Sequence, residues 1–226
     1  MQNRLIAVDG LDASGKRTQT ELLSATLAEK GIDYRYISFP TYKGDGCAAV
    51  NMYLRGDFGA DPNAVNAYAA SSFFAVDRYT SYMLDWKKDM ESGKVIIADR
   101  YSSANAVHQL SKMRPEERDG FLDWLCDFEF GKLGLPRPAA VIYLCMPPEM
   151  SECLLAARCR ETGSTPDIHE KNAAHLEASY RAAVYSAEKL GWIRVDCARG
   201  DVLRTREDIH DEIVERIKER LPDIGL

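Results

Sequence analysis

Short apolar runs alternate along the chain with longer segments whose apolar residues recur at a helical period. The runs resemble strands that are buried on both faces, and they cover residues 5–8, 34–38, 95–98, 139–145 and 192–196. Strands that alternate with helices form a parallel sheet with helices on both faces. We therefore expect a three-layer α/β/α sandwich around a five-stranded parallel sheet, in a single domain that spans residues 1–226.

The longest helical pattern runs from Pro62 to about Ser92. Its apolar positions recur at alternating steps of four and three residues, namely Val65, Ala69, Ser72, Val76, Tyr79, Met83, Trp86 and Met90. We interpret this stripe as core packing, and the alternative is that part of it packs on a second subunit. Phe74 and Arg78 share a helix face that lies about opposite Val76, so the pattern by itself places them at the surface.

The first apolar run leads directly into a glycine-rich loop and then into a helical segment at residues 16–30. In a phosphate-binding P-loop, Gly-x-x-x-x-Gly-Lys follows a strand and opens a helix, backbone N–H groups wrap a polyphosphate, and the lysine reaches its outer phosphates. Arg17 stands where a serine or threonine is expected. The motif and its context predict a nucleotide phosphate site at Gly10, Leu11, Asp12, Ala13, Ser14, Gly15, Lys16, Arg17 and Thr18.

Polar residues follow the third apolar run, where Asp99 and Arg100 come directly after Ala98. Ligands of open α/β sheets bind outside the carboxyl ends of the strands. We therefore expect Asp99 and Arg100 to lie near the phosphates held by the P-loop. The alternative for Asp99 is that it caps the helix that follows.

Two arginines, Arg158 and Arg160, lead into a segment that Gly163 and Pro166 interrupt. We expect a mobile helical lid at about residues 158–171 that supplies positive charge when it closes. The alternative is that these arginines are solvated surface charge.

The composition limits the classes of function. The chain has 226 residues, 46% of them hydrophobic and 28% charged, and a net charge of −6, so a general nucleic-acid surface is not expected. It has no uncharged apolar run of membrane-spanning length, and we expect a cytoplasmic protein. The six cysteines include no C-x-x-C pair and the four histidines form no ligand motif, so neither predicts a metal site.

Taken in order, these motifs resemble the thymidylate kinase family of the P-loop nucleoside monophosphate kinases. The resemblance is carried by the P-loop with its Asp12, and further along by Phe39-Pro40, Tyr53-Leu54, Phe74-x-x-x-Arg78, Asp99-Arg100-Tyr101 and segment 158–171. It implies a P-loop NTPase fold that uses ATP and Mg²⁺ to phosphorylate dTMP, giving dTDP and ADP. It also implies a homodimer.

The resemblance assigns roles to individual residues. On the donor side, Lys16 and the P-loop would hold ATP, and Arg158 and Arg160 would close over the transferring group. Asp99 would position Arg100 and the water bound to Mg²⁺, or bind the Mg²⁺ itself, rather than act as a base. Asp12 would accept from the sugar hydroxyl or orient a neighbouring arginine. The implied dTMP site comprises Asp12, Phe39, Tyr42, Leu54, Phe74, Arg78, Arg100, Asn105 and Gln109, with Phe74 stacked on thymine, Arg78 at a thymine carbonyl and Arg100 on the phosphate.

The chain departs from the family pattern at three positions. Arg17 replaces the hydroxyl that normally touches Mg²⁺, Ala13 stands where some members carry an arginine, and Tyr42 stands where an arginine often binds the dTMP phosphate. The alternative functions are a kinase for another nucleoside monophosphate, a deoxynucleoside kinase and, more distantly, a regulatory P-loop ATPase. Arg100 beside the acceptor favours an anionic acceptor over a neutral nucleoside.

Overall fold

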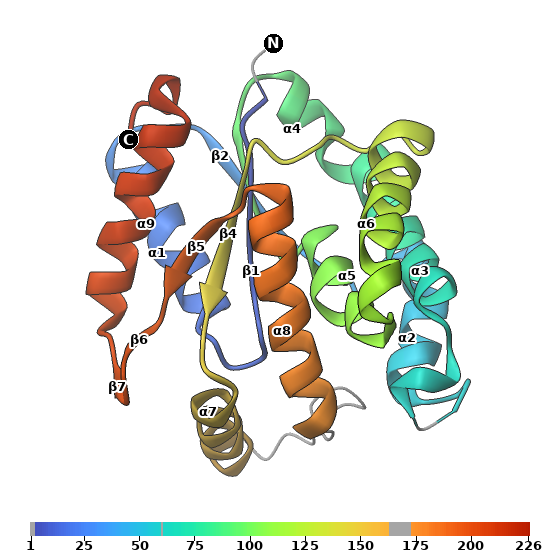
Figure 1. Ribbon diagram of the computed structural model, residues 1–226. Coiled ribbons are helices and arrows are strands. Elements are labelled where there is room, and N and C mark those ends of the chain that lie inside the picture. Colours follow the sequence, from blue (N-terminus) through green and yellow to red (C-terminus); the bar gives the residue numbers. More distant parts are fainter. Residues whose placement is uncertain (1–2, 60, 163–172) are drawn as a thin grey trace.

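The computed structural model describes residues 3–59, 61–162 and 173–226. At its centre lies a five-stranded sheet with the strand order β2-β3-β1-β4-β5, and all four pairings are parallel (Figure 1). The predicted sheet is confirmed, and each predicted run forms one strand. The strands are β1 (Leu5–Gly10), β2 (Tyr34–Ser38), β3 (Val95–Asp99), β4 (Ala140–Cys145) and β5 (Ile193–Asp196).

Helices cover both faces of the sheet (Figure 1). On one face, α1 (Lys16–Glu29) and α9 (Arg206–Arg220) pack side by side, and leucines of α1 join isoleucines spaced by four along α9 in one buried cluster. On the other face lie α4 (Lys87–Glu91), α5 (Ser103–His108) and α8 (Ala173–Leu190). Farther from the sheet on that side are α2 (Ala48–Arg55), α3 (Ala67–Ser81) and α6 (Arg118–Cys126).

The register of the strands brings the predicted polar residues to one edge of the sheet. Asp99 at the end of β3 is paired with Val8 of β1 on one side and with Ser38 of β2 on the other. Gly10, where the P-loop begins, is paired with Leu144 of β4. The P-loop and Asp99 therefore meet at the carboxyl edge of the sheet, where α7 (Pro148–Thr162) also lies (Figure 1).

The long helical pattern is broken into shorter elements. A 3₁₀ turn at Pro62–Ala64 precedes α3. Asn66 is the N-cap of α3, and its side chain accepts a hydrogen bond from the N–H of Ala69. A π-helical turn, Tyr82–Trp86, then separates α3 from α4. A second π-helical turn, Asp127–Lys132, follows α6.

The interpretation of the apolar stripe as core packing is wrong from the middle of α3 into the π-helical turn that follows it. Val76 is 50% exposed, Tyr79 39% and Met83 43%. The buried side of α3 carries small and polar residues instead, because it packs closely against the 3₁₀ turn Asp45–Cys47 and against α2. The buried residues are Ala67, Ala70, Ser71, Ala75, Asp77 and Arg78.

The connection between β5 and α9 contains a small antiparallel hairpin of β6 (Ala198–Arg199) and β7 (Val202–Leu203). The side chain of Thr205 caps α9 by accepting from the N–H of Asp208. Among the described residues, none of the helices has the length and apolar character that a membrane span requires.

Candidate active site

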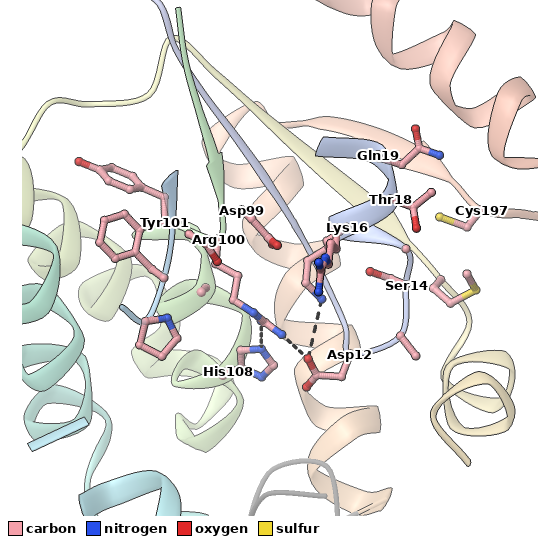
Figure 2. A pocket seen from close by; sticks show the side chains of 18 of the residues that line it. Asp12, Ser14, Lys16, Thr18, Gln19, Asp99, Arg100, Tyr101, His108 and Cys197 are labelled. Carbon is pink, nitrogen blue, oxygen red and sulfur yellow. Dashed lines mark hydrogen bonds and ion pairs between the residues drawn. The ribbon is translucent and has the colours of Figure 1, made fainter. Parts of the chain in front are cut away.

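A cavity of about 750 Å³ opens at the carboxyl edge of the sheet. It runs from the P-loop past Arg100 to α3 and α5, and on its other side to the hairpin and α9 (Figure 2). Most of the residues predicted for the two substrates line this one cavity. They are Asp12, Ala13, Ser14, Gly15, Lys16, Arg17, Thr18, Phe39, Tyr42, Leu54, Phe74, Arg78, Asp99, Arg100, Asn105 and Gln109.

The P-loop needs its two glycines for different reasons. A Cβ on Gly10 would lie 2.6 Å from Oγ of Ser14 and 2.8 Å from the carbonyl oxygen of Leu144, so only glycine fits between the loop and β4. Gly15 caps α1 with a φ of 87°, a left-handed conformation that glycine adopts without strain. The loop thereby aims the first N–H groups of α1 at the cavity, which is the arrangement that binds phosphate. Oγ of Ser14 is buried there and has no hydrogen-bond partner among the described residues.

Lys16 lies at the bottom of the cavity with only 8% of its surface exposed. Its Nζ donates to the carbonyl oxygens of Gly10 and Leu11, at 3.0 and 2.6 Å, and lies 3.8 Å from Oδ1 of Asp12. Burial, reinforced by the nearby positive charge of Arg100, lowers the pKa of Lys16 to about 8. Of the predicted ATP residues, Leu11 contributes only its backbone, because its side chain is fully buried in the core.

Arg100 extends from the end of β3 towards the P-loop (Figure 2). Its Nη2 donates to Oδ1 of Asp12, and its Nη1 lies 3.0 Å from Nε2 of His108. Because a guanidinium can only donate, Nε2 of His108 is the acceptor. Burial alone would lower the pKa of Arg100, but the carboxylates of Asp12, Asp9 and Asp99 raise it further above its usual range. Asp12 therefore orients the arginine, which is one of its two predicted roles.

Asp9 is a site residue that the sequence analysis missed. It is fully buried at the end of β1, where its Oδ1 accepts from the N–H of Gly10 at 2.9 Å and its Oδ2 accepts from Oγ of Ser103 at 2.8 Å. Burial raises its pKa even though Arg100 and Lys16 lie close by. A carboxylate inside an otherwise apolar strand was the available signal, and it was not used.

Asp99 sits at the cavity between β2 and the P-loop. Its Oδ2 accepts from the hydroxyl of Tyr36 on β2 at 3.3 Å. Burial, followed by the charge of Asp99, raises the pKa of Tyr36, so this hydroxyl stays protonated as a donor. Arg17 takes no comparable place, because its side chain is 83% exposed and its Nε donates to Oε1 of Glu21 at 2.9 Å.

The end of the cavity next to α3 and α5 combines an aromatic ring with buried polar groups. Phe74 packs edge-on against Tyr53, with ring centroids 6.1 Å apart. Arg78 is 1% exposed, and its Nε and Nη2 donate to the carboxylate of Glu129 at 2.8 and 2.5 Å. Oε1 of Gln109 is buried without a hydrogen-bond partner among the described residues. This end is built to receive a flat, polar-edged molecule.

Tyr42 lies on the loop between β2 and α2, which reaches the cavity after a cis peptide bond between Phe39 and Pro40. The loop is pinned to α3, because Thr41 donates to Asp77 through its N–H at 2.9 Å and through its hydroxyl at 2.5 Å. Ala13, Tyr42 and Arg100 have φ values of 58°, 55° and 65°, and all three line the cavity. Such conformations are unusual for residues other than glycine and tend to concentrate at functional sites.

The opposite end of the cavity is mainly apolar, and the sequence analysis did not predict it. Its lining comes from the end of β4, from α7, from the hairpin and from the start of α9, namely Met146, Leu154, Cys197, Leu203, Arg204, Arg206 and Ile209. Arg204 is held in place by Asp208 and Glu212, at 2.7 and 2.6 Å.

The predicted lid can be compared with the structure only in part. The side chain of Arg158 and residues 163–172 lie outside the described part of the chain. Arg160 lies on α7, where its side chain is exposed, and its Nε donates to the carbonyl oxygen of Ala156 at 3.2 Å. It is not among the described residues that line the cavity.

Comparison with known proteins decides the family. The model of the thymidylate kinase family matches residues 8–213. A thymidylate kinase from Mycobacterium tuberculosis is 31% identical over 195 residues, which cover 83% of this chain and 87% of that protein. The chain belongs to the thymidylate kinase family. As a thymidylate kinase it is a phosphotransferase, and the resemblance inferred from the motifs is confirmed.

Two further proteins extend the comparison. A thymidylate kinase from Plasmodium falciparum is 23% identical, covering 96% of this chain and 90% of that protein. The solved structure of a thymidylate kinase from Candida albicans superposes with a TM-score of 0.72 at 19% identity, covering 100% of this chain and 94% of that one. The latter supports the fold of this thymidylate kinase, an α/β sandwich of the P-loop NTPase type.

Proposed function

We propose that this kinase transfers the γ-phosphoryl group of ATP to dTMP, giving dTDP and ADP. One observation carries the proposal. A single cavity joins a P-loop with a buried lysine to a second, half-buried cation, Arg100, and ends beside Phe74 and Arg78. Phosphoryl transfer asks a protein mainly to align two phosphates and to offset their charge, and this cavity has the parts to do so.

On the donor side, Lys16 and the N–H groups at the start of α1 bind the β- and γ-phosphates of ATP. The adenine lies in the apolar end of the cavity, near Met146, Leu154 and Ile209. A mostly apolar wall with a few fixed polar groups suits a purine ring. The predicted lid, residues 158–171, would add Arg158 and Arg160 to the transferring group, in a single catalytic domain that comprises residues 1–226.

On the acceptor side, Arg100 binds the phosphate of dTMP. Asp12 and His108 hold its guanidinium, so the cation is oriented before the substrate arrives. Phe74 stacks on the thymine and Arg78 donates to a thymine carbonyl, with Phe39, Leu54, Asn105 and Gln109 around them. Because the attacking oxygen belongs to a phosphate that is already an anion, no residue has to act as a general base.

The residues fit a Mg²⁺ ion held mostly by its substrates. Among the described residues, no group of three His, Cys, Asp or Glu side chains forms a metal cage. Mg²⁺ is commonly bound by one or two carboxylates together with substrate phosphates, and Asp99 offers such a carboxylate at the cavity. When bound, the ion would offset the negative charge that develops on the phosphate oxygens.

Arg17 provides a test of the metal site. Its guanidinium faces solvent and pairs with Glu21, so no hydroxyl is available at this position. We expect Arg17→Ser to lower the Mg²⁺ concentration needed for half-maximal activity, because it restores an oxygen ligand next to the P-loop lysine. Glu21→Gln, which removes only the partner of Arg17, is the control. A Mg²⁺ titration that Arg17→Ser leaves unchanged would contradict this role.

A second copy of this chain is proposed to cover the exposed apolar stripe of α3 and the π-helical turn after it. Val76, Tyr79, Met83 and Leu84 lie on this surface, and Leu84 is 76% exposed. Apolar side chains that gather on a regular element typically mark an interface, and a homodimer would bury them.

We also place this kinase in the cytoplasm. All six cysteines are free thiols, and Cys153 is exposed. A reducing compartment keeps such thiols reduced.

The test of the function is an assay of ADP release with dTMP, dUMP, UMP, CMP and thymidine as acceptors. We expect the highest kcat/KM with dTMP. The kcat/KM for thymidine should be much lower, because thymidine has no phosphate for Arg100 to bind. Preference for another nucleotide would overturn the assignment of thymine to this pocket. Preference for thymidine would overturn the role of Arg100, and ADP release without any acceptor would favour a regulatory ATPase.

A further inference from the structure

Glu129 is a fully buried carboxylate that does not line the cavity. It lies in the π-helical turn after α6, and three N–H groups point at it. Arg78 donates through Nε and Nη2, at 2.8 and 2.5 Å, and Asn105 donates through Nδ2 to Oε1 at 3.0 Å. One buried carboxylate therefore holds two residues of the proposed thymine pocket at once.

These contacts decide how the amide of Asn105 is turned. Nδ2 lies 3.0 Å from Oε1 of Glu129 and 3.3 Å from the carbonyl oxygen of Ser71, and both of these atoms are acceptors. An amide turned the other way would set Oδ1 against two acceptors in a buried place, and unpaired buried groups are costly. The amide is thus fixed with Nδ2 towards Glu129, and Oδ1 is the atom that Asn105 offers to the cavity.

The carboxylate of Glu129 also determines which hydrogen-bonding groups of Arg78 remain for a ligand in the cavity. Two of its N–H groups are taken by the two oxygens of Glu129, the bidentate geometry that orients a guanidinium most firmly. Nη1 reaches the carbonyl oxygen of Tyr101 at 3.4 Å. The N–H groups that remain are donors, and a guanidinium has no acceptor to present.

We propose that Glu129 sets the polarity of base recognition in this kinase. By turning Asn105 and Arg78 it presents one acceptor and one donor to the cavity. This pair matches the N3–H donor and the C4 carbonyl acceptor of thymine or uracil. Cytosine presents the opposite pattern, an N3 acceptor and a 4-amino donor, and is rejected. The inference rests on the proposed thymine pocket, and within it Glu129 is a positioning residue that does not touch the substrate.

Such a fixed pair can discriminate strongly. A base with reversed polarity leaves buried groups of the enzyme unpaired, and sites built on hydrogen bonds reject such analogues far better than apolar pockets reject a missing methyl group. The structure therefore assigns the choice between oxo and amino pyrimidines to a carboxylate outside the cavity.

Glu129→Gln tests the proposal with little change in shape. A glutamine amide has one acceptor oxygen and one NH₂ group, so it cannot accept from both Nε and Nη2 of Arg78, and in one of its two orientations it also sets its NH₂ group against Nδ2 of Asn105. That orientation favours the turned amide of Asn105, which would then show a donor to the base, and either orientation removes the two-point anchor of Arg78. We expect kcat/KM for dTMP to fall by about tenfold or more and kcat/KM for dCMP not to fall, while KM for ATP stays within about twofold.

The matched control is Asp127→Asn. Asp127 lies in the same π-helical turn, but it is exposed and pairs with Lys132 at 3.5 Å. Its substitution should leave the ratio of dTMP to dCMP efficiencies at the wild-type value. If Glu129→Gln lowers both efficiencies in parallel and the ratio is unchanged, Glu129 has only a structural role and the proposal is overturned.

Two further variants keep the proposal testable if Glu129→Gln does not fold. Asn105→Ala retains the pair of Arg78 and Glu129 but removes the acceptor, and retention of the wild-type ratio would overturn the proposal. The double variant Glu129→Gln/Asn105→Asp keeps the net charge and restores a group that can only accept. The double variant should recover the preference for dTMP over dCMP. If its ratio of the two efficiencies is no higher than that of Asn105→Ala, the proposal is contradicted.

Failure of the proposed pocket has a different signature. If the wild-type enzyme uses dCMP as well as it uses dTMP, the assignment of thymine to this end of the cavity is wrong. If the wild type prefers dTMP and Glu129→Gln keeps the same ratio, only the role of Glu129 is wrong.

Discussion

Raising the pH through 8 should weaken the use of ATP by this kinase, because Lys16 loses its charge in that range. Burial and the charge of Arg100 lower the pKa of Lys16 to about 8. A group with that pKa is about nine-tenths charged at pH 7 and about one-tenth charged at pH 9. If the phosphates bind mainly to the charged lysine, kcat/KM for ATP falls by about sixteenfold between pH 8 and pH 9.5.

The effect on stability has the opposite sign, which separates the two explanations of lost activity. The pKa of Lys16 is lowered on folding, so between pH 8 and pH 10.5 the unfolded chain binds more protons than the folded protein. In that window the free energy of unfolding therefore rises with pH as far as this lysine is concerned. Deprotonation of Lys16 therefore does not unfold the protein, and weaker use of ATP above pH 8 cannot be explained by a loss of stability caused by this residue.

The assay is kcat/KM for ATP at saturating dTMP, measured from pH 6.5 to pH 9.5 together with the melting temperature. The last ionisation of a phosphate monoester, near pH 6, lies below this inflection. Lys112→Met is the control, because burial also lowers the pKa of Lys112 to about 8 although that lysine does not line the cavity. A profile that stays flat to pH 9.5, or an inflection that disappears in Lys112→Met, would refute the reasoning.

Two other predictions concern the surroundings of α3 and the π-helical turn after it. Gly46→Ala would place a Cβ 2.6 Å from Oγ1 and 2.8 Å from Cβ of Thr80, so we expect a loss of ~1–3 kcal/mol in the free energy of unfolding by urea, with KM raised for dTMP more than for ATP. Gly120→Ala, where no atom lies within 4 Å of the added Cβ, is the control and should not be destabilised. Leu84→Asp should give a monomer in size-exclusion chromatography with light scattering, whereas Asp85→Asn should not, and a monomeric wild type would contradict the dimer proposal.

Local motifs explain why half of the site could be predicted from sequence. The P-loop is a continuous segment whose strand, glycines and lysine are read together, and Asp99 follows from the rule that ligands bind at the carboxyl ends of parallel strands. Neither prediction requires knowledge of which helix packs where. Lys16 of the P-loop and Asp99 both line the cavity.

The base pocket could not be derived from the apolar pattern. The stripe on α3 pointed away from the core, so the pattern placed Arg78 at the surface, whereas it is 1% exposed. Only the family resemblance assigned it to the thymine. Glu129 gave no signal, because an isolated glutamate within a helical pattern is usually solvated and its buried partner is 51 residues away.

The apolar end of the cavity was missed for a related reason. Its residues come from β4, α7, the hairpin and α9, and each of them is an ordinary core or loop residue within its own segment. Long-range packing alone brings them together. Sequence patterns with periods of two or 3.6 residues carry no information about such an assembly.

The π-helical turn Asp127–Lys132 ties substrate choice to the number of residues in the chain. A π turn is equivalent to one residue added to an α-helix, and Glu129, which is fully buried, lies within this one. Removing one residue from this turn would restore α-helical geometry and rotate the side chains on one side of it by about 100° relative to the other. Relatives that differ here by a single deletion would therefore differ in base preference even if every pocket-lining residue were identical.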